Sequence, residues 1–254
     1  MTGLKPIAEI MFSDFLAVCW DIVANEMAKM RYMTDGQVSM PVVIRTANGA
    51  GSRFGAQHSQ AVENWAMAVP GLKVIAPAFP ADVKGLIAAA VRDPDPVIVF
   101  EQKSLYPFKG EVPDGEVVDQ LGKAKVLRQG KDCTIVALAL MVHRALAAAE
   151  ILEKEHGISC TVVDVRSLVP LDTLTILAEV AKTGRLVTIE ENPRLCGWGA
   201  EVASIVADEI FWDLDGPIIR ITTPHIPLPA ADLLEDNTIP SVERIVREIR
   251  EKID

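Results

Sequence analysis

Cysteine is scarce in this chain of 254 residues, and its four cysteines stand far apart. Zinc knuckles and dithiol redox centres need two cysteines separated by a few residues, and no such pair is present. The spacing therefore suggests neither kind of site. We predict reduced and mostly buried thiols at Cys19, Cys133, Cys160 and Cys196.

Basic residues are also few, with 25 Lys and Arg against 35 Asp and Glu and a formal net charge of -10. Without a local basic cluster, this charge repels nucleic acid and anionic lipid surfaces. No apolar run is long enough to cross a membrane, and the N-terminus has no basic stretch followed by an apolar core and a cleavage site. We expect no nucleic-acid or membrane partner and a cytoplasmic, bacterial-type location.

The glycine fingerprints of nucleotide-binding folds are missing as well, because neither Gly-x-Gly-x-x-Gly nor a Walker loop occurs. One glycine-rich run remains, Asn48-Gly49-Ala50-Gly51-Ser52. Its backbone amides are able to bind an anion, but such runs are more often simple tight turns. Anion binding at this loop is a weak hypothesis on its own.

Half of the residues are hydrophobic, and they form short Val- and Ile-rich runs that alternate with segments of helical periodicity. Strands are expected at residues 7–12, 42–45, 73–76, 97–101, 134–139, 160–165, 185–190 and 218–222. Helices are expected at residues 14–31, 81–92, 142–156, 172–182, 199–211 and 242–252. This alternation predicts an α/β protein with two doubly wound, mostly parallel sheets. A Gly- and Pro-containing stretch at residues 103–130 is interpreted as the crossing between the two domains, at residues 1–115 and 116–254.

The best candidate for acid–base chemistry is His58, in the polar run Gly55-Ala56-Gln57-His58-Ser59-Gln60 directly after the glycine loop. Imidazole titrates near neutral pH, and neighbouring Gln and Ser groups are able to fix its tautomer. An ordinary histidine at a helix start explains the same residues. Met11 and Phe15 likewise fit an apolar core, although a thioether beside an aromatic ring also suits a flat heterocycle.

Several longer motifs follow one another along the chain. They include Gly3-Leu4-Lys5-Pro6, Met30-Arg31-Tyr32-Met33, Ala56-Gln57-His58-Ser59-Gln60, Pro70-Gly71-Leu72-Lys73-Val74, Lys182-Thr183-Gly184-Arg185-Leu186 and Leu234-Glu235-Asp236. In this order they resemble, nearly end to end, the beta subunit of the thiamine-diphosphate-dependent 2-oxo acid (pyruvate or branched-chain) or acetoin dehydrogenase component, in the transketolase-like superfamily. The resemblance implies a pyrimidine-binding domain followed by a transketolase C-terminal-like domain.

The resemblance also implies partners and cofactors. An alpha subunit would complete a heterotetramer, with thiamine diphosphate across the alpha–beta interface and magnesium on the alpha side. The chain agrees by omission, because it lacks the Gly-Asp-Gly and downstream Asn that hold the metal and diphosphate. A small 2-oxo acid or acetoin would be the substrate, and a lipoyl-bearing acyltransferase core would dock on the C-terminal domain. The chain alone would be inactive.

Individual site residues follow from the same resemblance. Met11 and Phe15 would pack around the aminopyrimidine ring of the cofactor, and His58 would face the bound intermediate as a proton donor or acceptor. A second group of positions ligates a structural potassium ion in some family members, largely through backbone carbonyls. Those positions are Val42, Ala90, Val91, Asp93 and Asp95, and Asp95 stands where an amide is found elsewhere.

The family places a cofactor-activating glutamate upstream of the position matched by Met1, and Glu9 matches a different family position. We expect a mis-called start or fragment of an ordinary subunit rather than a shortened, weakly active paralogue. Two further alternatives stay open. One is a noncatalytic assembly module, and the other is the carboxyl half of a transketolase or deoxyxylulose-phosphate synthase, for which Arg45 and Arg53 are the nearby phosphate-binding candidates.

Overall fold

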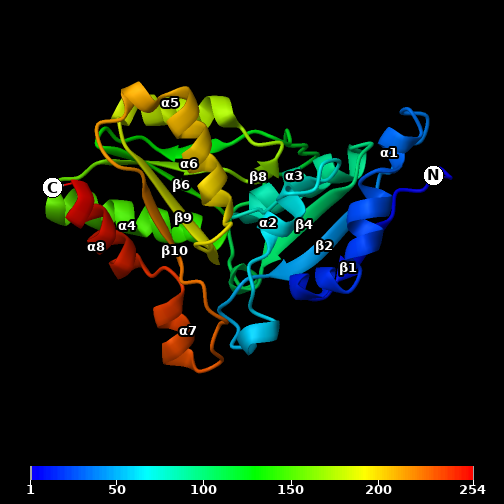
Figure 1. Cartoon of the computed structure of the whole chain (residues 1–254), viewed down its shortest axis with the longest axis horizontal. Coiled ribbons are helices and arrows are strands. Elements are labelled where there is room, and N and C mark those ends of the chain that lie inside the picture. Colours follow the sequence, from blue (N-terminus) through cyan, green and yellow to red (C-terminus); the bar gives the residue numbers. More distant parts are fainter. Residues whose placement is uncertain (1, 254) are drawn as a thin grey trace.

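The computed structural model describes residues 2–253 as two neighbouring sheets covered by helices (Figure 1). Each sheet has five strands, four of them mutually parallel and one antiparallel strand at an edge. The first sheet has the order β1 (Ile7–Ile10), β2 (Val43–Asn48), β4 (Val97–Gln102), β3 (Lys73–Ile75) and β8 (Ser167–Val169). The second has the order β10 (Ile219–Thr223), β9 (Leu186–Pro193), β6 (Cys133–Ala137), β7 (Cys160–Asp164) and β5 (Lys125–Arg128). The predicted α/β class with two mostly parallel sheets is confirmed.

The central strands are mostly apolar and are buried along their whole length, as expected of parallel strands with helices on both faces. All residues of β4, β6 and β7 are buried. The long helices are α3 (Pro80–Arg92), α4 (Leu140–His156), α5 (Thr173–Thr183), α6 (Trp198–Glu209) and α8 (Val242–Ile253). Gly157 and Gly184 end α4 and α5 in the left-handed conformation, which glycine adopts at little cost. No helix within residues 2–253 has the length and apolar character of a membrane span.

The expected helix at residues 14–31 is wrong as a single element. The segment is instead a 3-10 turn (Ser13–Ala17), a π-helical turn (Ile22–Met27) and the short α1 (Met30–Met33). Val18 is 83% exposed and Ile22 56% exposed, so the apolar residues of this segment do not all face one core. Spacing alone does not distinguish such a broken segment from a continuous amphipathic helix.

Four short elements escaped the sequence analysis: β5, β8, α2 (Glu63–Met67) and α7 (Asp232–Thr238). Two of them are antiparallel edge strands, which carry little periodic signal at three or four residues. β8 pairs with β3, although it follows β7 in sequence. The proposed boundary between residues 115 and 116 lies in the irregular stretch before β5 and stays a prediction.

The two sheets share a hydrophobic core. One buried cluster contains Phe100 of β4, Val136 of β6, Val163 of β7 and Trp198 of α6. Because β1, β2 and β4 are parallel, their carboxyl ends meet at one edge of the first sheet. Figure 1 shows this edge beside α7. The segments that follow these strands build the candidate site.

Candidate functional site

His58 follows the 3-10 turn Gly55–Gln57 and packs within a group of phenylalanine rings. The Phe12 ring stacks on the imidazole, with centroids 5.0 Å apart and an interplanar angle of 21°. The Phe15 ring lies 5.2 Å from the imidazole, and Phe54 meets Phe12 edge-on at 5.4 Å. Nδ1 of His58 is buried without a hydrogen-bond partner, whereas Nε2 is not among the buried, unpartnered atoms. The geometry therefore leaves Nε2 as the ring nitrogen available for proton transfer.

Met11 and Phe15 occupy the turn after β1, beside this aromatic group. The structure brings Phe15 to His58 and leaves Met11 73% exposed and Phe15 42% exposed. Large apolar side chains that stay exposed at a strand end indicate a surface that another group covers. A thioether and an aromatic ring offer flat, polarizable contacts without competing hydrogen bonds. These residues therefore fit a planar heterocycle such as an aminopyrimidine.

Lys103 is part of the site, although it fell inside the stretch interpreted as the domain crossing. It begins the 3-10 turn Lys103–Leu105 directly after β4. Its Nζ donates a hydrogen bond of 2.9 Å to the backbone oxygen of His58 and lies 5.4 Å from the centre of the Phe12 ring. Burial lowers the pKa of Lys103, opposed by the charges of Asp14, Glu191 and Glu235.

The glycine loop at residues 48–52 does bind an anion, but the anion is a side chain of the protein. The amide of Ala50 donates to Oε1 of Glu191, which is a buried residue of β9. Gln102 donates to the other oxygen of Glu191 at 3.2 Å. At Gly49 a Cβ atom would stand 2.7 Å from Oε1 of Glu191. Glu191 therefore takes the place of a bound phosphate and joins the second sheet to the loop.

A second buried carboxylate lies next to this contact. Glu63 accepts hydrogen bonds from Nδ2 of Asn48 at 2.8 Å and from Nδ2 of Asn192 at 3.2 Å. Asn48 also accepts one from Ser13 at 2.8 Å. Burial raises the pKa of Glu63 to about 7, and the charge of Glu191 adds to this shift. The network fixes the carboxyl ends of β2 and β9 against the turn after β1.

Neither candidate phosphate-binding arginine is free. Nη1 of Arg53 lies 2.5 Å from Glu235, and the same guanidinium contacts Asp232 and Asp236 at 3.1 and 2.9 Å. These ion pairs attach α7 to the loop before His58. Arg45 makes two hydrogen bonds to Glu101, of 2.6 and 3.0 Å. Arginines that are already paired with carboxylates do not favour a sugar-phosphate site.

The positions predicted for potassium meet at the opposite, amino-terminal end of the first sheet. Nζ of Lys73 lies 2.7 Å from Asp93 and 3.3 Å from Asp95, and Arg31 lies 2.7 Å from Asp95. The carbonyl oxygens of this group also accept hydrogen bonds. Val42 accepts from Val97 N, Ala90 from Asp93 N, and Val91 from Nζ of Lys5. Within residues 2–253, no cluster of three His, Cys, Asp or Glu residues is arranged to hold a metal ion. The side chains at these positions do not fit an added cation, because lysine and arginine already neutralise them.

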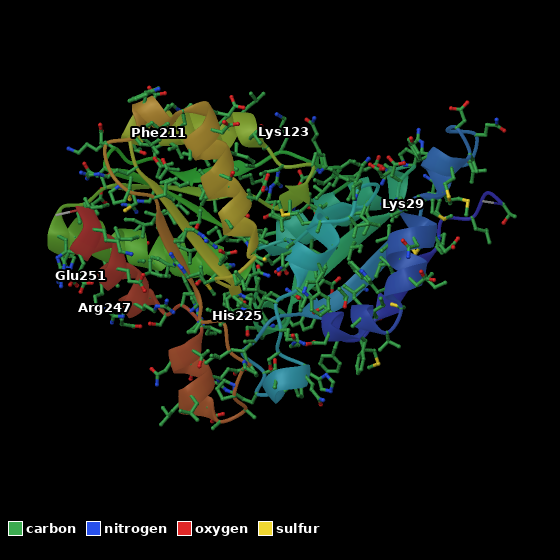
Figure 2. All side chains as sticks on the ribbon, viewed as in Figure 1. Lys29, Lys123, Phe211, His225, Arg247 and Glu251 are labelled. Atoms are coloured by element: carbon green, nitrogen blue, oxygen red, sulfur yellow. The ribbon has the colours of Figure 1, made fainter. Side chains whose placement is uncertain are left out.

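A cleft of about 790 Å³ opens between the two sheets beside the site. Ala56 and Gln60 line it from the His58 segment. Cys196 and His225 line it from the second sheet, and Figure 2 shows His225 near the middle of the molecule. The segments after β9 and β10 thus contribute to the cleft, through Leu195, Ile226 and Pro227 as well.

Two family models match the chain and together cover most of it. The transketolase pyrimidine-binding domain matches residues 1–109, and the transketolase C-terminal domain matches residues 122–245. The chain therefore has the domain pair of the transketolase type, a pyrimidine-binding domain followed by a C-terminal domain.

Relatives narrow the assignment. The beta subunit of acetoin:2,6-dichlorophenolindophenol oxidoreductase from Bacillus subtilis (strain 168) is 48% identical over 96% of this chain and 71% of its own length. The mitochondrial pyruvate dehydrogenase E1 component subunit beta-2 from Oryza sativa subsp. japonica is 47% identical over 96% of this chain and 66% of its own length. The chain belongs to the family of beta subunits of thiamine-diphosphate-dependent 2-oxo acid and acetoin dehydrogenases, as the sequence motifs predicted.

A solved structure supports the fold over nearly the whole chain. The split-gene transketolase in its inactive beta4 tetramer matches with a TM-score of 0.80 and 26% sequence identity, over 99% of this chain and 76% of the other. The match therefore extends over both sheets. The transketolase-type architecture is therefore confirmed, while the roles of the individual site residues stay predictions.

Proposed function

We propose that this chain supplies the pyrimidine-binding half of a dehydrogenase that acts on a small 2-oxo acid or on acetoin, together with an alpha subunit. The observation that carries the proposal is the position of His58 against the half-exposed Phe15, in the segment after β1 that also holds the exposed Met11. An acid–base group next to an uncovered apolar surface is what a planar cofactor requires from this half of the site.

Thiamine diphosphate, when bound, supplies the carbon nucleophile for cleavage next to the substrate carbonyl. The residues of this chain bind and orient. Met11 and Phe15 hold the aminopyrimidine ring, and Phe12 and Phe15 exclude water from the faces of the imidazole. His58 takes up or releases a proton at Nε2. The missing Gly-Asp-Gly motif supports a magnesium and diphosphate site on the alpha subunit.

The proposed assembly is an alpha/beta heterotetramer whose acyl product passes to a lipoyl carrier. The lipoyl-bearing acyltransferase core would dock on the second domain, at residues 116–254. Large apolar side chains are exposed on both domains, among them Val18 at 83% and Trp212 at 93%. Such residues support contacts with further subunits, because isolated soluble domains seldom expose them in groups.

Reconstitution tests the proposal. The chain, and a version preceded by the N-terminal segment that carries the family's cofactor-activating glutamate, would each be expressed with the alpha subunit. Decarboxylation of pyruvate and branched-chain 2-oxo acids and cleavage of acetoin would then be followed with an artificial electron acceptor. We expect turnover that depends on thiamine diphosphate with at least one of these substrates. A folded heterotetramer that binds the cofactor but turns over none of them contradicts the proposal.

The potassium positions give a separate prediction. Because Lys5 and Lys73 already place ammonium groups at Val91, Asp93 and Asp95, we expect the same thermal midpoint in KCl and in tetramethylammonium chloride. Differential scanning fluorimetry at matched ionic strength measures this. A midpoint higher in KCl by more than ~3 °C would instead show that the carbonyls of Val42, Ala90 and Val91 bind potassium.

A further inference from the structure

Lys103 is an unusual lysine, because it is 93% buried and forms no ion pair. Its exposed fraction is 7%, and among residues 2–253 no carboxylate lies within ion-pair distance of its Nζ. The nearest negative charges, on Asp14, Glu191 and Glu235, act on it through space. Burying an ammonium group costs free energy unless its contacts compensate. The contacts of this group therefore require an explanation.

Those contacts all lead to the proposed proton-transfer residue. Nζ donates to the carbonyl oxygen of His58 at 2.9 Å. The same ammonium group lies 5.4 Å from the centre of the Phe12 ring, and that ring stacks on the imidazole at 5.0 Å. Lys103 thus holds His58 through its backbone and through its stacking partner. It does not contact the imidazole nitrogens.

The backbone around Lys103 is itself fixed by the glycine loop. The side chain of Gln102 accepts from the amide of Ser104 at 2.7 Å, and the hydroxyl of Ser104 donates to the carbonyl of Ala50 at 3.1 Å. Gln102 also donates to Ala50 and to Glu191, at 3.1 and 3.2 Å. The second sheet, the glycine loop and the turn after β4 therefore place the ammonium group as one unit.

The buried, unpartnered Nδ1 of His58 adds an independent reason for positioning. No hydrogen bond from a neighbouring side chain orients the imidazole at this nitrogen. Catalytic histidines usually have such an orienting bond. Here the ring depends on stacking and on its backbone for its orientation.

We propose that Lys103 is a positioning residue, which holds the backbone of His58 and the Phe12 ring so that Nε2 of His58 faces the bound substrate. The proposal rests on the function proposed above. Lys103 does not touch the reacting atoms. Its positive charge and its single hydrogen bond keep the imidazole in the orientation that proton transfer requires.

The test compares Lys103→Met with Lys103→Arg in the reconstituted heterotetramer. The methionine variant keeps the apolar stem and loses the donor and the charge, whereas the arginine variant retains both. We expect Lys103→Met to lower kcat by ~10- to 100-fold with KM changed less than about threefold, because orientation and not binding is lost. Lys103→Arg should recover most of that loss. Lys103→Gln, which keeps a neutral donor, replaces the methionine variant if the latter does not fold.

A double-mutant cycle separates positioning from general structural support. If Lys103 acts through His58, adding Lys103→Met to His58→Gln should lower kcat by less than about twofold further. Full additivity of the two losses, or a kcat within about threefold of the wild type for folded Lys103→Met, would overturn the proposal.

A measurement that does not depend on enzyme activity tests the role of Lys103 separately from the proposed function. Diethyl pyrocarbonate modifies accessible imidazole nitrogens, and peptide mass spectrometry measures the rate at His58 in the beta chain without cofactor. Release of the ring in Lys103→Met should change that rate by about threefold or more, with Lys103→Arg close to wild type and exposed His156 as the internal reference. If the wild-type complex is inactive but Lys103→Met still changes the modification rate of His58, only the proposed function is contradicted. If Lys103→Met leaves the modification rate unchanged, the role of Lys103 is contradicted.

Discussion

His58→Ala is expected to lower kcat of the reconstituted heterotetramer by ~10²- to 10⁴-fold, the range that removal of a general acid–base group produces. The imidazole has its Nδ1 buried without a hydrogen-bond partner, and alanine has no group that takes up or releases a proton. The apolar surface at Met11 and Phe15 stays intact. We therefore expect the cofactor dissociation constant, measured by calorimetry, to change less than about threefold.

The matched control is His156→Ala, at the exposed end of α4 and far from the site in sequence. Its kcat should equal that of the wild type. Size-exclusion chromatography with light scattering would show that all three heterotetramers assemble alike. Unchanged turnover in an assembled His58→Ala complex removes the histidine from the mechanism and favours the noncatalytic assembly module.

The site residues that sequence reasoning found are those carried by ordered motifs. Phe15 and His58 lie in the segments that follow β1 and β2, and the carboxyl ends of parallel strands meet at one edge. The resemblance placed both residues at the cofactor, and the structure brings their rings to within 5.2 Å of each other. Met11 also lies at this edge with an exposed side chain, and its contact with the aminopyrimidine ring stays a prediction.

Residues that act only through tertiary contacts could not be found in this way. The amide of Ala50 and the carboxylate of Glu191 meet across 141 positions of sequence, and no local pattern announces that contact. Phe12 resembles any core aromatic residue until its ring is seen on His58. Lys103 follows a buried strand but precedes a Gly- and Pro-rich stretch, so composition assigned it to a domain crossing.

In the fold, too, features set by local sequence were predictable and features set by tertiary contacts were not. Helices stopped by Gly157 and Gly184 and strands such as β4 were predictable, because capping and continuous burial are local properties. β8 was not, because its three residues gain their structure by pairing with β3. Tertiary pairing decides the conformation of such short segments.

Arg166, the residue before β8, belongs to a second buried polar network. Nη1 of Arg166 lies 3.2 Å from Asp82 of α3 and 2.9 Å from Asp119. Asp164, at the end of β7, accepts the amide of Arg166 at 3.1 Å through Oδ1. Its Oδ2 is buried without a partner. Burial, and then the charge of Asp82, raise the pKa of Asp164 to about 8.

This shift predicts how stability depends on pH. A carboxyl group whose pKa is higher in the folded than in the unfolded protein binds more protons in the folded state between the two values. The free energy of unfolding therefore falls as the pH rises from the unfolded value of 3.8 to the folded value of about 8. Below the lower value both states are protonated, and the group has no effect.

Asp164→Asn should abolish this fall in the free energy of unfolding as the pH rises. Asparagine keeps an acceptor for the amide of Arg166 and adds no charge at the unpartnered position. We expect the variant to be more stable than the wild type by on the order of 5 kcal/mol at pH 8, with the difference shrinking towards zero near pH 4. Urea unfolding across this pH range measures it. Exposed Asp208→Asn in α6 controls for the loss of one surface charge, and parallel pH profiles for Asp164→Asn and the wild type would show that Asp164 is ionised in the folded protein throughout.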